Sequence, residues 1–260
     1  MKCCKRPTLS DLKLNVEDSG VFYRSQWTRL PALVFVAYRV LLALYLLGVY
    51  IALLVELIPS YGGSIFIFLT NIAFTVFVVY LLIAGSIAVL DGYILRRRNS
   101  ADMGVRHMIH WLLFNVTVNV NLIVTIVYWV GLYDPARGGF FFSFHVHAVT
   151  SIVSVADLVV TAVPVRLLHA VYPCVSLVAY MVLTLVYWGT SNGIVYPFLD
   201  YSCNPGLAAG SIVGIFLAIL STQVIVWAIY KLRVGMWKKC GGDGETTQAE
   251  IEQDKAENGL

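Results

Sequence analysis

The chain has 260 residues, of which 59% are hydrophobic and only 13% are charged. Its mean hydropathy of +0.78 excludes an ordinary soluble domain, and a net charge of +3 does not indicate a nucleic-acid partner. The apolar residues occur in runs of about 20 or more, the length that a helix needs to cross a bilayer. The composition therefore predicts an all-α integral membrane protein.

Six such runs follow one another along the chain, at residues 31–57, 64–90, 107–132, 140–166, 170–189 and 205–230. An even number of spans puts both termini on one side of the membrane. Of the 18 Lys and Arg residues, all but Arg39 and Arg137 fall on that side. The positive-inside rule therefore predicts that both termini are cytoplasmic. We therefore predict a six-transmembrane-helix bundle over residues 31–230.

The two ends of the chain differ in composition from the bundle. Residues 1–30 are polar and form a predicted cytoplasmic N-terminal segment. Residues 231–260 are basic at first, then Gly-rich and acidic, which predicts a disordered cytoplasmic tail. Cys3, Cys4 and Cys240 adjoin the membrane on this side and are candidates for lipidation.

The fourth run carries a ladder of polar residues. They recur every three or four positions, so on a helix they share one side: Ser143, His147, Thr150 or Ser151, Ser154, Asp157 and Thr161. Polar and ionisable residues in a membrane span normally face the interior of the bundle and indicate a functional site. We expect the other five spans to enclose this ladder.

Within the ladder, Asp157 is expected to have a structural partner. It lies about nine residues from the inner end of its span, and Arg39 lies about eight residues from the inner end of the first span. An unpaired charge at this depth costs several kcal/mol. Equal depth and opposite charge therefore predict an intramembrane ion pair between Arg39 and Asp157.

Depth also groups a hydroxyl with an imidazole. Thr70 lies about six residues into the second span and His147 about seven into the fourth, so both are roughly 10 Å below the outer rim. A hydroxyl nucleophile needs a nearby base, which an imidazole provides. The commoner alternatives are a Thr that bonds its own backbone and a His that tethers two helices.

Other chemistries find little support. The sequence lacks the GxSxG, HExxH, GxxxxGK[ST] and CxxC motifs, and its five His residues lie at opposite ends of the spans or on different helix sides. We therefore expect no metal site and no cofactor. The Asn and Thr residues of the third span and Gln223 of the sixth are expected to form interhelical hydrogen bonds. A transporter or channel is disfavoured because no inverted repeat is evident.

Three sequence blocks resemble a known family. Residues 61–64 (YGGS) and 68–70 (FLT), His147 with an acidic residue ten positions later, and residues 196–200 (YPFLD) are similar to blocks of the androgen-induced family of membrane fatty-acid-ester hydrolases. Residues 23–27 (YRSQW) and 164–169 (PVRLLH) resemble more closely the rolling-stone membrane proteins, a related branch linked to myoblast fusion.

The resemblance implies a reaction. In the hydrolase family a Thr and a His are the proposed catalytic pair that cleaves fatty acid esters of hydroxy fatty acids, which makes Thr70 the nucleophile and His147 the base. By position only, the candidates for binding the substrate or stabilising the oxyanion are Asn71, Ser151, Tyr196 and Asp200. Membrane lipids and a lipid ester are the expected partners, in the plasma membrane or the endoplasmic reticulum. The alternative is a non-enzymatic protein of the rolling-stone type that acts in cell fusion.

Overall fold

Six helical segments are long and apolar enough to cross a membrane. They belong to a computed structural model that describes residues 8–95, 103–137 and 139–240, and within those ranges they are Ala32–Ile67, Leu69–Ile94, Val105–Leu132, Phe140–Val160, Leu167–Ser191 and Pro205–Lys239. The predicted all-α fold with six membrane-spanning helices is confirmed, whereas the cytoplasmic location of the termini stays a prediction. The predicted lipidation of Cys3 and Cys4 and the predicted disorder after residue 240 lie outside the described residues.

The spans are built mainly from α-helix, in which each backbone group finds a partner within its own segment, as hydrocarbon requires. The α-helices are α1 (Ala32–Tyr61), α2 (Leu69–Ile87), α3 (Val105–Val127), α4 (Phe140–Phe144), α5 (Thr150–Val160), α6 (Val171–Ser191) and α7 (Pro205–Lys239). Three π-helical turns, at Ala88–Ile94, Tyr128–Leu132 and His145–Val149, extend α2, extend α3 and join α4 to α5. Short 3-10 helices occupy Leu9–Leu12, Ser19–Phe22, Gly62–Ile67, Pro135–Arg137, Leu167–Ala170 and Pro197–Leu199.

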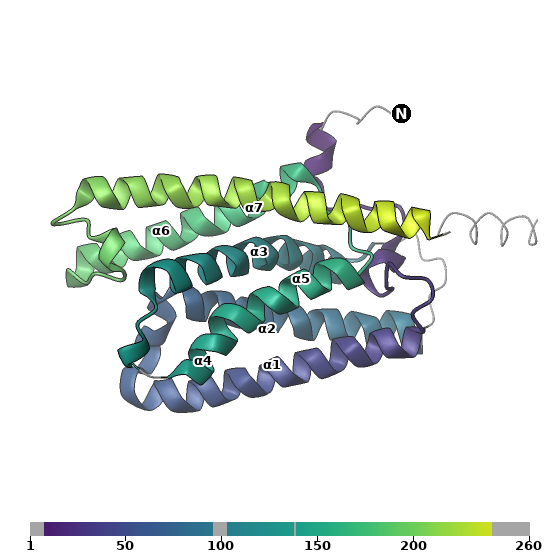
Figure 1. Ribbon diagram of the computed structural model, residues 1–260, viewed down its shortest axis with the longest axis horizontal. Helices are drawn as coiled ribbons and strands as arrows, with labels where there is room; N and C mark the ends of the chain where they lie inside the picture. The colour runs from purple at the N-terminus through teal and green to yellow at the C-terminus, as the bar shows by residue number, and fades with distance from the viewer. Residues whose placement is uncertain (1–7, 96–102, 138, 241–260) are drawn as a thin grey trace, which may run out of the picture.

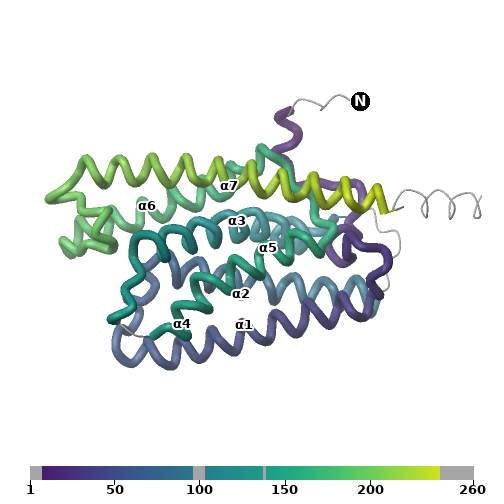
Figure 2. The backbone as a smooth tube through the Cα atoms, viewed as in Figure 1, coloured from purple at the N-terminus to yellow at the C-terminus, as the bar shows by residue number. Residues whose placement is uncertain are grey.

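Helix α3 is the centre of the bundle. It packs against α2, α5, α6 and α7, while α1 packs against α2. Figures 1 and 2 show α6 and α7 along one side of α3 and α1 and α2 along the other. Helix α1 begins and α7 ends at the same end of the bundle, which we call the terminal face (Figure 1). The other end, which holds residues 62–68 and 192–204, is called the far face.

The fourth span ends earlier than predicted. The prediction extended the helix to Arg166, but α5 ends at Val160 and residues 161–166 are not helical. Pro164 has no N–H and disfavours helical geometry at the residue before it. Other elements bond the freed carbonyl groups: Trp111 Nε1 donates to Pro164 O at 2.9 Å, and Gln223 Nε2 donates to Arg166 O at 2.8 Å.

The N-terminal segment is part of the bundle rather than a separate element. Ser25 forms an antiparallel bridge with Thr161, and Gln26 N donates to Val160 O at 3.0 Å. Phe22 is fully buried and stacks on the ring of His107. The segment therefore covers the end of α5 at the terminal face.

Helix α7 also exceeds its predicted length. We predicted that the sixth span ends at Tyr230 and that a disordered tail follows, but the helix continues to Lys239. Arg233 in this extension is 2% exposed and reaches into the bundle, so packing rather than hydropathy determines the end of the helix.

Candidate functional site

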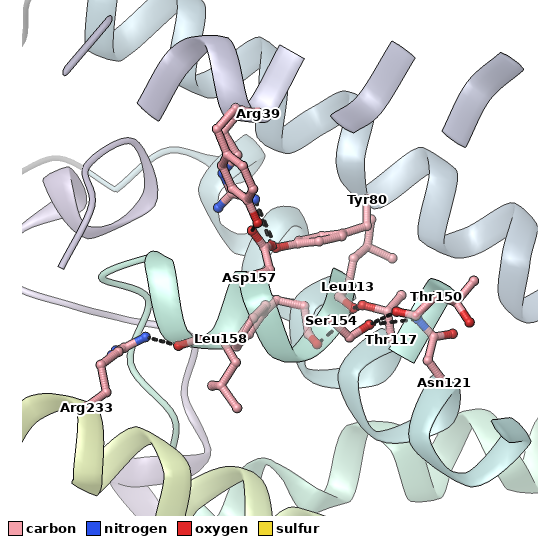
Figure 3. Close-up of polar contacts among 12 residues, drawn as sticks. Arg39, Tyr80, Leu113, Thr117, Asn121, Thr150, Ser154, Asp157, Leu158 and Arg233 are labelled. Carbon is pink, nitrogen blue, oxygen red and sulfur yellow. Dashed lines mark hydrogen bonds and ion pairs between the residues drawn. The ribbon is translucent and has the colours of Figure 1, made fainter. Parts of the chain in front are cut away.

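The polar ladder of the fourth span faces the bundle interior, as the sequence indicates. Thr150, Ser154 and Asp157 are each at most 2% exposed. Asn121 of α3 donates to Ser154 Oγ at 2.9 Å, and Ser154 donates to the carbonyl of Thr150 at 2.8 Å. Figure 3 shows this row running along α5 toward Asp157. Most of the ladder thus holds α5 against α3.

Asp157 and Arg39 are brought together inside the membrane. Arg39 Nη1 lies 2.7 Å from Asp157 Oδ2, and both side chains are 1% exposed (Figure 3). Tyr80 donates its hydroxyl to the same carboxylate oxygen, and Tyr38 donates to Oδ1 at 3.2 Å. The sequence predicted the pair but not the two phenols, which carry no distinguishing pattern. The cluster ties α1, α2 and α5 together.

Thr70 lies in the first turn of α2 at the far face. It lines a small cavity together with Tyr128, Tyr196 and Phe198. The helix begins here because Phe68 is extended, with φ −80° and ψ 127°, and its carbonyl accepts the N–H groups of Asn71 and Ile72. The nucleophile candidate thus lies at the positive end of a helix dipole.

Two phenol oxygens accept a hydrogen bond from the first N–H group of α2. Leu69 N donates to Tyr196 Oη at 3.1 Å and to Tyr180 Oη at 3.2 Å. Tyr180 then donates its own proton to Ile67 O at 3.1 Å. Burial raises the pKa of Tyr196, so this phenol stays protonated at neutral pH. Tyr180 was missed by sequence reasoning because nothing in its span marks it.

His147 is close to the Thr70 cavity but does not bond to Thr70. Its ring stacks on Tyr128 with the centroids 3.3 Å apart, and its carbonyl accepts the hydroxyl of Thr125. Its Nδ1 is buried and has no hydrogen-bond partner among the described residues. Tyr128 therefore adjoins both predicted catalytic residues, whereas the sequence placed the hydroxyl directly beside the imidazole.

A π-helical turn explains the different placement. Residues His145–Val149 form this turn, which changes the helical phase of His147 relative to the ladder below. His145, two positions earlier, contacts Tyr45 of α1 through a 2.7 Å bond between its Nε2 and the phenol. The two His residues thus point to different neighbours, as the sequence predicted.

The remaining candidates bond the protein itself. Asn71 Nδ2 donates to Ile65 O at 2.9 Å, and Ser151 Oγ donates to Asn121 O at 2.8 Å. Asp200 Oδ1 accepts the backbone N–H groups of Ser202 and Cys203, at 2.9 and 2.8 Å, and so closes a turn. Of the four candidates proposed by position, Tyr196 is the one that lines the Thr70 cavity.

No group of three or more His, Cys, Asp or Glu side chains gathers as a metal site would need, within the described ranges. Of the polar residues of α3, Asn119, Asn121 and Thr125 bond neighbouring helical segments, as predicted. Asn115 and Thr117 instead bond carbonyl groups of α3 itself. Asn119 Nδ2 donates to Gln223 Oε1 at 2.7 Å, and Thr222 donates to Asn119 Oδ1 at 2.9 Å. These bonds join α3 to α7.

Replacing Gln223 with Met is expected to lower the free energy of unfolding by about 1 kcal/mol, because Asn119 and the carbonyl of Arg166 both lose a partner. Unfolding in mixed detergent micelles measures this difference. Ser221→Ala is the control, since Ser221 is exposed and bonds only Leu217 O, and it is expected to change stability by less than about 0.5 kcal/mol. Equal stabilities of the two variants would contradict the prediction.

Comparison with known proteins gives a consistent family. The family model described as Protein rolling stone matches residues 8–241. The chain is similar to Protein rolling stone of Drosophila melanogaster, with 32% identity over 231 residues that cover 82% of this chain and 83% of that protein. No solved structure matches the chain significantly. The matched region includes all six spans together with Thr70, His147 and Tyr196, so this multi-pass membrane protein belongs to the rolling stone family.

Proposed function

We propose that this protein is an intramembrane hydrolase of lipid esters in which Thr70 is the nucleophile. The observation that carries the proposal is the position of Thr70, which lines a cavity at the first turn of α2 together with Tyr196. A nucleophile at a helix N-terminus is next to N–H groups and a positive dipole, both of which favour the negative charge of an oxyanion.

In the proposed reaction, Thr70 Oγ attacks the ester carbonyl carbon and its proton passes to His147. The electron pair moves to the carbonyl oxygen, which accepts hydrogen bonds from the O–H of Tyr196 and from the start of α2. His147 then protonates the leaving alcohol, and water releases the acyl group from Thr70 in a second round. Because Tyr128 stacks on His147 and lines the Thr70 cavity, direct transfer of the proton from Thr70 to His147 requires the Tyr128 ring to move.

The proposed substrates are fatty acid esters of hydroxy fatty acids, after the resemblance to the hydrolase family. The proposed location is the plasma membrane or the endoplasmic reticulum. The cavity lies among membrane-spanning helices near the far face, so a lipid ester in that leaflet reaches Thr70 without leaving the membrane.

Labelling with a fluorophosphonate probe tests the proposal. The wild-type protein in lipid nanodiscs is expected to gain the probe on the peptide that contains Thr70, and Thr70→Ala is expected to abolish labelling. His147→Ala is expected to slow ester turnover by about 10²- to 10⁴-fold, the range for a general base. Thr75→Ala is the matched control, because Thr75 lies in the same helix and donates to Asn71 O at 2.7 Å.

Two results would contradict the proposed hydrolase activity of Thr70. One is a wild-type protein that neither takes up the probe nor turns over an ester. The other is labelling that persists in Thr70→Ala and is lost in Thr75→Ala. The first outcome leaves the non-enzymatic alternative, a membrane protein of cell fusion, and the second rejects Thr70 as the nucleophile.

A further inference from the structure

A second and larger cavity lies deeper in the membrane, beside the Thr70 cavity. Its volume is about 310 Å³, and its walls come from α2, α3, α6 and α7. This volume is at the lower end of the range of about 300–1,000 Å³ for small-molecule sites. On α6 the walls run from Ser176 to Leu183, a length of about 10 Å along the helix axis.

The walls of this cavity offer no free donor to a ligand. The three polar side chains among them are already bonded: Thr117 to Leu113 O, Ser176 to Pro173 O, and the Asn121 amide to Ser154 Oγ. The other residues that face the cavity, apart from the phenol of Tyr180, are aliphatic. A ligand with its own polar groups would lose hydrogen bonds here, because nothing would replace water around them. The chemistry therefore fits a hydrocarbon chain.

The cavity opens toward the bilayer between α2 and α6. Val76 of α2, Val120 of α3 and Leu183 of α6 are only half-buried, and Ala179 of α6 is exposed, although all four line the cavity. Helices α2 and α6 meet at the far face, where Leu69 bonds Tyr180, and have few contacts below it. A chain can therefore enter sideways from the hydrocarbon region.

The two cavities are adjacent. They share wall residues from all four helices, among them Leu69, Ile123, Leu177 and Tyr180. A ligand that fills both has a long apolar part in the larger cavity and a polar group beside Thr70 and Tyr196. A fatty acyl ester has this shape.

We propose that the larger cavity binds the fatty acyl chain of the ester that Thr70 attacks, and that its depth sets a preference for long chains. The identity of the ligand rests on the proposed hydrolase function. The chain site itself is a property of the four helices and can be tested without catalysis.

The test fills the cavity from α6. Ala179→Phe puts a ring into the cavity. Because Ala179 is an exposed residue, the substitution leaves the packed core unchanged. The control is Val178→Phe. Val178 directly precedes Ala179, is 49% exposed and does not line the cavity. The probe is a fatty ester with a diazirine on its acyl chain, added to each protein in nanodiscs and activated by light. Mass spectrometry of the wild type is expected to find cross-links at Val76, Val120 or Leu183.

Ala179→Phe is expected to reduce these cross-links at least about tenfold, the effect of losing a methylene-sized part of an apolar pocket, while Val178→Phe leaves them unchanged. In an active protein, Ala179→Phe also lowers kcat/KM for a long-chain ester and leaves that for an acetate ester unchanged. Cross-links confined to the outer, lipid-facing helix surfaces, or equal in both variants, would overturn the chain site. So would a phospholipid that stays in the cavity when excess ester is added.

The chain site and the hydrolase can fail separately. Cross-links in the cavity together with no fluorophosphonate labelling retain the chain site and reject the hydrolase. Labelling at Thr70 with cross-links elsewhere rejects the chain site alone.

Discussion

Asp157→Ala is expected to lower the free energy of unfolding by about 3–5 kcal/mol, the usual cost of leaving one partner of a buried ion pair alone. The guanidinium of Arg39 would remain 1% exposed in the middle of the bundle without its carboxylate. Tyr38 and Tyr80 would lose the acceptor that both of them bond. Unfolding by steric trapping in bilayers measures the difference, because it keeps the membrane present.

A double-mutant cycle separates the pair from its neighbours. Arg39→Met with Asp157→Leu removes both charges together and fills their volume with apolar groups, which is often neutral for buried pairs. The double variant is therefore expected to lose less stability than the sum of the losses in Arg39→Met and Asp157→Leu, even though Tyr80 still lacks its acceptor. Strictly additive losses would show that the two residues do not interact and would contradict the ion pair.

Arg233→Met is expected to destabilise the protein by about 2–6 kcal/mol, because it leaves two buried carbonyl groups unpaired at about 1–3 kcal/mol each. Arg233 Nη1 donates to Leu158 O at 2.6 Å and Nη2 donates to Val163 O at 2.9 Å, as Figure 3 shows for the first of these bonds. The positive charge also lies at the C-terminal end of α5, where a helix dipole favours a cation.

The matched control for Arg233→Met is Lys231→Met. Lys231 lies in the same helix and carries the same charge, but it is exposed. Its Nζ contacts the face of Trp227, 5.4 Å from the ring centroid, instead of a buried carbonyl group. We expect a change below about 0.5 kcal/mol from this surface substitution. Losses of the same size in the two variants, measured by the same unfolding assay, would mean that Arg233 acts through net charge and not by bonding α5.

The sequence predicted the parts of the fold that depend on hydropathy and depth. Six spans follow from apolar run length, and the Arg39–Asp157 pair follows from equal depth with opposite charge. The end of α5 was missed although Pro164 marks it, because the run stays apolar to Val165 and hydropathy does not register a change of backbone geometry. The burial of Phe22 was missed because a short polar segment gives no sign of the surface that it will meet.

The candidate site shows the same division. Depth brought Thr70 and residues 196–200 to one level, and the structure has Tyr196 beside Thr70. The orientation of His147 was not predictable, because a π-helical turn shifts the ring by a phase that ideal helix geometry does not contain. Tyr180 and Tyr128 needed the three-dimensional arrangement, since an aromatic near the end of a span is common in any membrane protein.

The bonds around residues 158–166 also join segments that are translated at different times. The carbonyl groups of Leu158 and Val163 leave the ribosome well before Arg233 of α7, which binds both of them. Gln26 is translated before α5 and contributes a bond to the same stretch through Val160 O. A nascent chain stopped before α7 is therefore expected to form the bond of Gln26 and to leave the other two carbonyl groups without their guanidinium.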